Sequence, residues 1–350
     1  MATRSTRSLL VANPTARTGR AGKAIDAAME RLERARLRPE FFATLPDGAT
    51  VPKLADRLEH GDIGRVIYLG GDGTFAETAK GIILARERYG VDIPLGMLPM
   101  GTANDQGRSF GIYAGVRALD RNIEIIAQGI ESWLDVGRVE TLDEAGEVIA
   151  QDLWFDSWGV GLSAQILATR NRDKVLVAKV PVLRQIYRDR VIYVRAGVSH
   201  FLRSLIKRKR FAAELTVDGE RIEYASLTDI VVKGTLLFGG DWIFAEEGKP
   251  DDGKFEVVIM QGHTDWARAT IANHKRNPVT GDDMAVLGLA KKERPIHQGK
   301  HIEVRLFRPT GIPALHSQID GEEFRYADHY RIENLYHHLR IIVPESPHWV

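Results

Sequence analysis

Hydrophobic and polar positions follow two different rhythms along the chain, one in the first third and another after residue 131. In the first third, short apolar runs alternate with segments whose apolar residues recur every three or four positions, as on one face of a helix. The runs expected as strands are 8–12, 41–43, 66–69 and 94–98, and the expected helices cover 24–32, 51–58 and 75–83. Alternating strands and helices predict a parallel sheet with right-handed crossovers. We therefore expect a doubly wound α/β domain over residues 1–132.

After residue 131 the pattern changes to the two-residue period of half-buried strands. Strands are expected at 133–139, 148–155, 211–217, 222–232, 255–260, 301–307 and 340–343. Asp218-Gly219 separates two of these runs and is typical of a tight hairpin turn. Residues 133–350 are therefore expected to form a mainly antiparallel, β-sandwich-like domain, and its last strand is a candidate to return to the first domain.

Composition excludes several classes of protein. The chain holds 44% hydrophobic and 27% charged residues, as a globular protein does and a disordered one does not. It contains no cysteine, which excludes disulfides, a thiolate nucleophile and a cysteine-based zinc site. No segment approaches a run of about 20 apolar residues, the length of a membrane-spanning helix, and the run 9–12 is too short for a signal peptide. These features predict a cytoplasmic protein that reaches membranes only peripherally.

Charge is nearly balanced over the whole chain but concentrated in one stretch. The net charge of +1 excludes a global positive field for nucleic acid. Residues 170–210, however, hold thirteen lysines and arginines against two aspartates, with aromatic and aliphatic residues between them. A solvated amphipathic helix and a helix on an anionic membrane surface both fit this composition. No nucleic-acid motif accompanies the stretch, so we expect no nucleic-acid partner.

A glycine-rich loop, Gly70-Gly71-Asp72-Gly73-Thr74, directly follows the third expected strand. Its backbone N–H groups and the N-terminus of the next helix can surround phosphate oxygens. Glycine is needed wherever a Cβ atom would keep the backbone away from a phosphate. Asp72 alone repels phosphate, so its presence indicates a Mg²⁺ ion between the carboxylate and the phosphates. The alternative is a strand-to-helix turn in which Asp72 caps the helix.

Two further loops are expected at the same edge of the sheet, because loops that follow parallel strands converge there. The fourth strand is followed by the loop Pro99-Met100-Gly101-Thr102-Ala103-Asn104-Asp105. In this loop Asp105 is a candidate for a second metal-facing carboxylate, and Thr102 is a candidate hydrogen-bond donor to a phosphate. The alternative is a capping loop in which Thr102 is the N-cap of a helix. After the first strand, Asn13-Pro14-Thr15 is an ordinary turn when taken by itself.

Taken in order, these motifs resemble the diacylglycerol kinase catalytic family, which includes bacterial lipid kinases and sphingosine and ceramide kinases. The resemblance extends over nearly the whole chain, through Glu77, Gly161-x-Ser163-Ala164, Pro250-Asp251-Asp252-Gly253-Lys254 and Asp320-Gly321-Glu322. The chain departs from the family pattern at Ala76, at Gln106-Gly107 and at Asp156. These departures leave the groups needed for phosphoryl transfer in place and affect the expected contacts with the lipid.

The resemblance implies sites for ATP, for Mg²⁺ and for a lipid alcohol. Glu322 would be the general base that deprotonates the lipid hydroxyl, and Asp72 and Asp105 would organise the catalytic Mg²⁺. A separate structural Mg²⁺ would be held by the Asp252 side chain and the backbone oxygens of Lys249 and Lys254. The implied ATP site is lined by Asn13, Pro14, Thr15, Ala16, Arg17, Thr44, Gly71, Asp72, Gly73, Thr74, Phe75, Ala76, Glu77 and Thr102. Which lipid is the acceptor, and whether the protein is a homodimer, stay open.

Other interpretations remain beside the ATP- and Mg²⁺-dependent lipid kinase. A kinase of the NAD kinase type shares residues 70–74 but also carries a Thr-Pro-Thr-Gly-Ser-Thr-Ala-Tyr segment, which this chain lacks. A non-catalytic regulator that binds lipid or nucleotide would not need a general base. Glu322 itself could be part of a simple hairpin, because Asp218-Gly219-Glu220 has the same three residues, and residues 251–253 could be only a β-turn.

Overall fold

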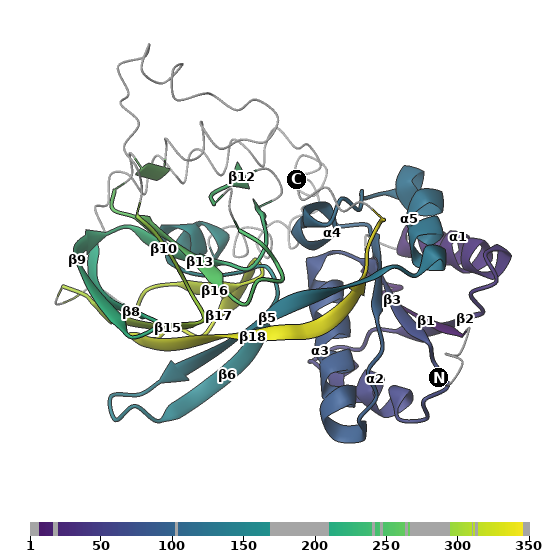
Figure 1. Cartoon of the computed structure of the whole chain (residues 1–350), viewed down its shortest axis with the longest axis horizontal. Coiled ribbons are helices and arrows are strands. Elements are labelled where there is room, and N and C mark those ends of the chain that lie inside the picture. Colours follow the sequence, from purple (N-terminus) through teal and green to yellow (C-terminus); the bar gives the residue numbers. More distant parts are fainter. Residues whose placement is uncertain are drawn as a thin grey trace, which may run out of the picture. The chain divides into compact units, whose positions relative to one another are not determined.

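The computed structural model describes residues 7–16, 20–101, 104–168, 210–239, 242–245, 248–262, 265–266, 295–309, 311 and 314–345. The chain divides into two compact units. The first unit comprises Met1–Val136, Gly234–Gly253 and Leu335–Val350, and the second comprises Gly137–Lys233 and Lys254–Asn334. Figure 1 shows the helices of the described chain gathered mainly in the first unit and the antiparallel strands in the second.

The first unit contains the expected parallel sheet. Its strands are β1 (Ser8–Ala12), β2 (Pro39–Ala43), β3 (Arg65–Gly70) and β4 (Leu95–Pro99), paired in the order β2-β1-β3-β4. Its helices are α1 (Arg20–Arg34), α2 (Thr50–Leu58), α3 (Asp72–Tyr89), α4 (Asp105–Ser109) and α5 (Leu119–Gln128), and Val116–Ala118 is a single 3₁₀ turn. A short hairpin of β11 (Leu237–Phe238) and β12 (Trp242–Ile243) also belongs to this unit. The expected doubly wound α/β domain is confirmed.

Alternation along the buried strands explains why helices cover both faces of this sheet. Leu10 and Ile67 face one side, where they share a core with apolar residues of α1 and α5. The side chain of Tyr68, one position further along β3, faces the other side and meets Phe75 of α3 edge-on, with ring centroids 5.3 Å apart. Strands that are apolar on both faces need a helix on each face to exclude water.

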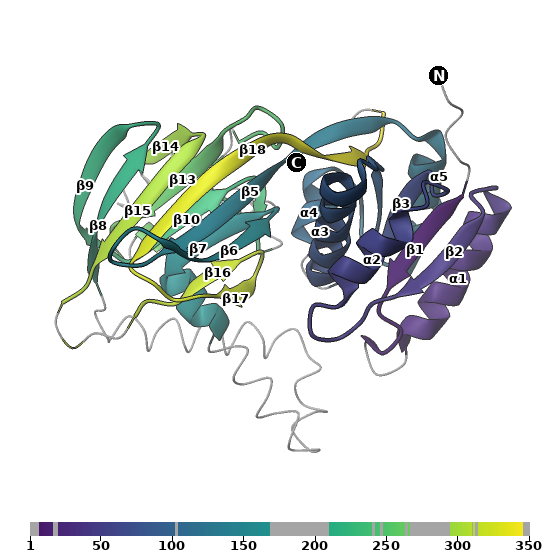
Figure 2. The same cartoon turned by 90° about the horizontal axis from the view of Figure 1, so that it is seen from below.

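The second unit is a sandwich of antiparallel strands (Figure 2). One layer pairs β15 (His301–Phe307) with β8 (Phe211–Val217) and the first half of β18 (His329–Ile342), and β9 (Glu220–Leu227) follows β8. The other layer runs in the order β14 (Ile296–Gly299), β13 (Phe255–Met260), β10 (Asp229–Lys233), β7 (Ser157–Gly161), β16 (Ser317–Ile319) and β17 (Glu322–Phe324). Fully buried Trp154, Trp158 and Tyr330 fill the space between the layers. The expected β-sandwich is confirmed.

Two long strands contribute residues to both units. They are β5 (Glu131–Leu142), which pairs with β6 (Val148–Trp154), and β18. Within the first unit, the end of β18 lies parallel to β4, where Ile341 pairs with Leu95. The parallel sheet therefore gains a strand from the end of the chain.

The structure differs from the sequence expectation at one apolar run. Residues 222–232 were expected as one strand, but they form β9 and β10 in different layers of the sandwich. The chain changes layer at Thr228, whose backbone N–H and hydroxyl both donate to the carbonyl of Met260. An apolar run that continues through such a crossing carries no signal of it. The basic stretch 170–210 lies outside the described residues except for Arg210.

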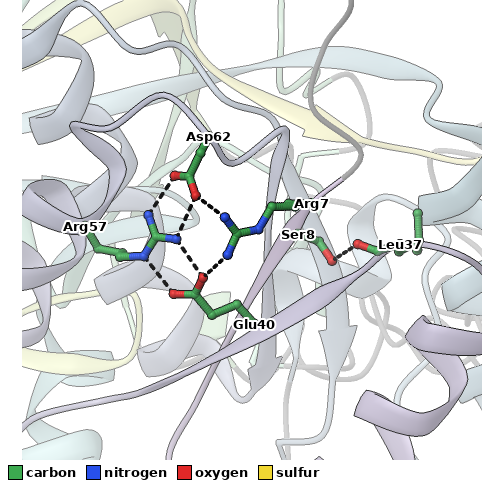
Figure 3. Close-up of polar contacts among 6 residues, drawn as sticks. All are labelled: Arg7, Ser8, Leu37, Glu40, Arg57 and Asp62. Atoms are coloured by element: carbon green, nitrogen blue, oxygen red, sulfur yellow. Dashed lines mark hydrogen bonds and ion pairs between the residues drawn. The ribbon is translucent and has the colours of Figure 1, made fainter.

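Four charged side chains form a closed ring at the amino end of the parallel strands (Figure 3). Arg7 precedes β1, Glu40 lies in β2, Arg57 in α2, and Asp62 precedes β3; each carboxylate binds both guanidinium groups. Arg57 reaches Glu40 at 2.6 Å and Asp62 at 2.8 Å. The hydrogen bond from Arg57 is the main cause that holds the pKa of each carboxyl below its usual value. The ring ties three strands and a helix together at the end opposite the glycine-rich loop.

Among the described residues, no helix has the length and apolar composition needed to span a bilayer.

Candidate active site

The glycine-rich loop connects β3 to α3 in the first unit. Gly71 is the residue before the helix and is extended, with φ −98° and ψ −171°, and Asp72 begins α3. A carboxylate in the first turn of a helix is stabilised by the positive end of the helix dipole. At Gly70 a Cβ atom would lie 2.5 Å from the Thr74 hydroxyl. The loop therefore folds tightly over its own helix.

The loops that follow β3 and β4 cross backbone to backbone. The N–H groups of Met100 and Gly101 both donate to the carbonyl of Gly70, at 2.6 and 3.1 Å. A Cβ atom on Gly101 would lie 2.6 Å from the Cα atom of Gly71, closer than real Cβ contacts come. Neither loop can move away from the other without losing this contact. The structure thus brings together two loops that the sequence placed at one sheet edge.

Asn104 holds the two candidate metal-facing residues in place. Its backbone N–H donates to Asp72 Oδ2 at 3.0 Å, and its side-chain oxygen accepts from the N–H of Gly101 at 2.7 Å. Asn104 adopts the left-handed conformation, with φ 54°, and is 1% exposed. Asp105, the next residue, begins α4 and is 7% exposed. The two carboxylates therefore belong to one linked structure, and carboxylate oxygens are the ligands that Mg²⁺ prefers.

Gly73 gives the clearest test of whether the loop fits a phosphate. It is exposed in the first turn of α3, and a Cβ atom there would meet no other atom of the chain within 4 Å. Its φ is not positive, so neither packing nor backbone conformation requires glycine. Space that a Cβ atom would fill, beside a helix N-terminus, is what a phosphate needs. The residues present fit a nucleotide phosphate and its Mg²⁺.

The first loop and Thr44 lie side by side at the ends of β1 and β2. The Asn13 side-chain oxygen accepts from both the backbone N–H and the hydroxyl of Thr15, at 2.9 and 2.8 Å. The N–H of Thr44 donates to the carbonyl of Ala12 at 3.0 Å, which extends the pairing of the two strands. Pro14 is exposed, and Ala16 is half-buried. Arg17 and Thr102, two of the expected ATP-site residues, lie outside the described residues.

The expected contacts along α3 do not all face outward. The Phe75 side chain is 1% exposed and packs against Tyr68 in the core. Its backbone N–H donates to Gly71 within the turn. Ala76 and Glu77 are half-buried, and Thr74 lies against Gly70. Helix periodicity turns the Phe75 side chain toward the sheet, so the expected contribution of Phe75 to the ATP site rests on its backbone and stays a prediction.

The segment expected to hold a structural metal is an anchored turn. Buried Asp135 accepts from the N–H groups of Gly253 and His337 at 2.7 and 2.8 Å, and its own N–H donates to Pro250. Asp252 and Lys249 are exposed within this turn, and Lys254 begins the next segment of the chain. Among the described residues, no group of three or more histidines, aspartates and glutamates could hold a metal. The expected site has only one side-chain ligand, so the absence of such a group does not decide it.

Glu322 begins β17 in the second unit, directly after the Asp320-Gly321 turn. It pairs with Ile319, is exposed, and makes no side-chain hydrogen bond with the described part of the chain. Glu220 occupies the same place after Asp218-Gly219 and is equally exposed. Both turns have positive φ at the aspartate and the glycine, so they are the same kind of hairpin turn. Exposure and turn geometry alone do not separate Glu322 from Glu220.

Charged residues beneath the Glu322 turn were not foreseen from the sequence. Lys233 is 1% exposed at the end of β10, and its ammonium binds Asp156 at 2.7 Å. A buried ion pair is expensive to form, so it is seldom present without a reason. The signal was present in the sequence, because the apolar run 230–232 lies directly between two charged residues, Asp229 and Lys233.

The first part of the chain is similar to a known family. Residues 7–139 match the model of the diacylglycerol kinase catalytic domain. These residues are similar to a diacylglycerol kinase catalytic domain. The matched range includes Asn13, the glycine-rich loop and Asp105, and it ends before the Asp252 turn and Glu322.

Relatives of this domain extend the comparison. The chain is 29% identical to a diacylglycerol kinase of Staphylococcus aureus (strain bovine RF122 / ET3-1) over 133 residues, which is 38% of this chain and 40% of that protein. The similarity thus spans less than half of the curated relative. A crystal structure of a diacylglycerol kinase from Bacillus anthracis matches 98% of the chain and 99% of its own length, with a TM-score of 0.65 and 19% identity. At that identity the structural match establishes a shared fold.

Proposed function

We propose that the chain is a kinase that transfers the γ-phosphoryl group of ATP, with Mg²⁺, to the hydroxyl of a lipid alcohol. The observation that carries this proposal is the pair of crossed loops, in which Asn104 ties Asp72 to the loop of Asp105 while Gly73 leaves room for a phosphate. The match of residues 7–139 to the diacylglycerol kinase catalytic domain supports it.

In phosphoryl transfer the protein contributes mainly by positioning the reactants and by neutralising charge. The N–H groups at the start of α3 would bind the nucleotide phosphates. Asp72 and Asp105 would hold the Mg²⁺ ion, which when bound offsets negative charge on the phosphate oxygens. The backbone N–H of Asn104 orients Asp72, so the carboxylate does not need to reorganise. Glu322 would accept the proton of the acceptor hydroxyl as the new bond forms.

Further parts of the proposal rest on residues outside the crossed loops. The Asp252 side chain and the backbone oxygens of Lys249 and Lys254 would hold a structural Mg²⁺, since carbonyl and carboxylate oxygens suit that ion. The lipid would be reached at a membrane surface, where the protein associates peripherally.

Transfer from labelled ATP to a panel of acceptors tests the proposal. The panel holds diacylglycerol, phosphatidylglycerol, a sphingoid base and ceramide in mixed micelles, with NAD as the soluble acceptor. Label in at least one lipid and none in NAD is the expected result. Label in NAD alone would contradict the lipid acceptor, and nucleotide binding without transfer to any acceptor would favour a non-catalytic binding protein.

A further inference from the structure

The turn that carries Glu322 is anchored by an unusual set of hydrogen bonds within the second unit. The carboxylate of Asp320 accepts from three consecutive backbone N–H groups, those of Phe155 at 2.9 Å, Asp156 at 2.7 Å and Ser157 at 3.2 Å. The Asp320 N–H donates in turn to the carbonyl of Ser157 at 2.9 Å. The turn is therefore bound to the connection between β6 and β7, about 165 residues earlier in the chain.

A second route ties the same turn to the buried ion pair. The N–H of Gly321 donates to the Gln318 side-chain oxygen at 2.8 Å, and the Gln318 amide donates to the Ser157 hydroxyl at 3.3 Å. That hydroxyl donates to Asp156 Oδ2 at 3.1 Å, while Lys233 binds Asp156 Oδ1. Gln318 and Lys233 are 3% and 1% exposed, so water does not compete for these groups. The chain of contacts runs without a gap from Lys233 to the turn.

Glycine at position 159 makes room for this arrangement. A Cβ atom there would lie 3.2 Å from the Gln318 amide nitrogen. A side chain at that position would therefore displace Gln318 or weaken its hydrogen bond to Ser157.

The matching turn at Asp218 lacks the buried hydrogen bonds and the ion pair that surround Asp320. Asp218 has the same backbone conformation as Asp320, with φ 50° against 48°. Its carboxylate accepts from the N–H groups of Lys300 and His301, but the residue is exposed, and no buried ion pair among the described residues contacts it. Burial, and next the negative charge of Asp156, raises the pKa of Asp320 to about 7. Asp320 is half-buried, and the exposed Asp218 shows that the hairpin itself does not need that burial.

We propose that Asp320, with Gln318, is a positioning residue that fixes the direction of the Glu322 carboxylate toward the acceptor hydroxyl. This inference rests on the proposed function. An exposed glutamate with no partner of its own has many rotamers and a mobile backbone unless the turn before it is held. Misplacing a catalytic group by about 1 Å can lower the rate about 100-fold. The anchored turn removes that freedom from the backbone of Glu322.

A double-mutant cycle on the full chain tests the proposal. In Asp320→Asn, Oδ1 can keep its contacts, but an amide NH₂ replaces Oδ2 opposite the Phe155 N–H, so the turn shifts without losing its shape. We expect kcat for lipid phosphorylation to fall about tenfold to 100-fold while the KM for ATP stays unchanged. Glu322→Gln should lower kcat about 10²–10⁴-fold. In the Glu322→Gln background, Asp320→Asn should have no further effect, because the group it positions is gone.

Two further variants distinguish a loss of positioning from a folding defect. Gln318→Met keeps the size of the side chain but removes the Gly321 contact, and it should lower kcat in the same way. Asp218→Asn changes the sister turn and should leave kcat unchanged. Thermal unfolding of each variant measures the folded fraction, so kcat is compared per folded molecule.

The outcomes separate the two claims. If Glu322→Gln lowers kcat as expected and Asp320→Asn lowers it by the same factor in that background as in the wild type, Asp320 acts independently and the positioning role is refuted alone. An Asp320→Asn variant with wild-type kcat refutes it as well. If the wild type transfers no label to any lipid, or Glu322→Gln is silent, the proposed function or its base fails, and the positioning role fails with it.

Discussion

Replacing Gly73 by alanine should move stability and nucleotide binding in opposite directions. Gly73 is the second residue of α3, its φ is not positive, and an added Cβ atom would meet no atom of the chain within 4 Å. Alanine restricts the unfolded chain and favours a helix, so the free energy of unfolding should rise by about 0.4–1 kcal/mol. The added methyl group, however, would fill the space assigned to a phosphate.

The expected loss of ATP binding follows from the size of that methyl group. Forcing one extra methyl group into a filled site costs about 1–3 kcal/mol, which corresponds to an increase of about 5- to 160-fold in Kd. Calorimetric titration with ATP and Mg²⁺ gives Kd, and thermal unfolding of the unliganded protein gives stability. A more stable variant with unchanged Kd would refute the assignment of Gly73 to a phosphate.

Gly101→Ala is the matched comparison from the neighbouring loop. Its Cβ atom would lie 2.6 Å from the Cα atom of Gly71, so the crossed loops must separate by about 1 Å to reach an ordinary carbon–carbon distance. This variant should lose both stability and ATP binding. The pair thus distinguishes a methyl group that damages the protein from one that only blocks the ligand.

Three other predictions concern separate parts of the chain. Arg57→Met should lower the unfolding free energy by about 1 kcal/mol at neutral pH without changing kcat. Because the pKa values of Glu40 and Asp62 are lowered in the folded state, the difference between wild type and variant is present above the unfolded pKa and should disappear as the pH falls through the folded pKa. Burial raises the pKa of Asp229 to about 7, so the contribution of Asp229 to stability is present below about pH 4 and is lost as the pH rises toward 7. In Asp229→Asn, the unfolding free energy measured in urea should therefore fall less over that pH range, by up to about 4 kcal/mol, and the same fall as in the wild type would contradict the raised pKa. Glu322→Gln should lower kcat about 10²–10⁴-fold and Glu220→Gln should be silent in the same lipid assay, and equal behaviour of the two would reduce Glu322 to a turn residue.

The parallel sheet could be predicted from the sequence because each of its elements carries a local signal. The strands 8–12 and 66–69 are apolar on both faces and end at loop-forming residues, and the helices between them have one apolar face. The layer change at Thr228 and the short strands β16 and β17 could not be predicted in the same way. Their pairing depends on partners far along the chain, and a continuous apolar run does not show which sheet each half joins.

Much of the candidate site could be predicted as residues but not as contacts. The order of the motifs placed Asp72 and Asp105 at one edge of the sheet, and the structure links their loops through Asn104. The hydrogen bond from Asn104 to Asp72 joins segments 32 residues apart, so no local sequence pattern predicts it. The anchoring of Asp320 to residues 155–157 is likewise invisible in the Asp-Gly-Glu motif, which reads the same at residues 218–220.

The central claim is that the crossed loops of the first unit support transfer of phosphate from ATP to a lipid. The most direct measurement is the transfer of label from γ-labelled ATP to lipid in mixed micelles by the wild type and by Asp72→Asn. Asparagine keeps the shape of the side chain and can keep the Asn104 contact, but it removes a charge that holds Mg²⁺. We predict transfer by the wild type, and a loss of several orders of magnitude in a folded Asp72→Asn variant. Wild-type transfer by Asp72→Asn would contradict the account.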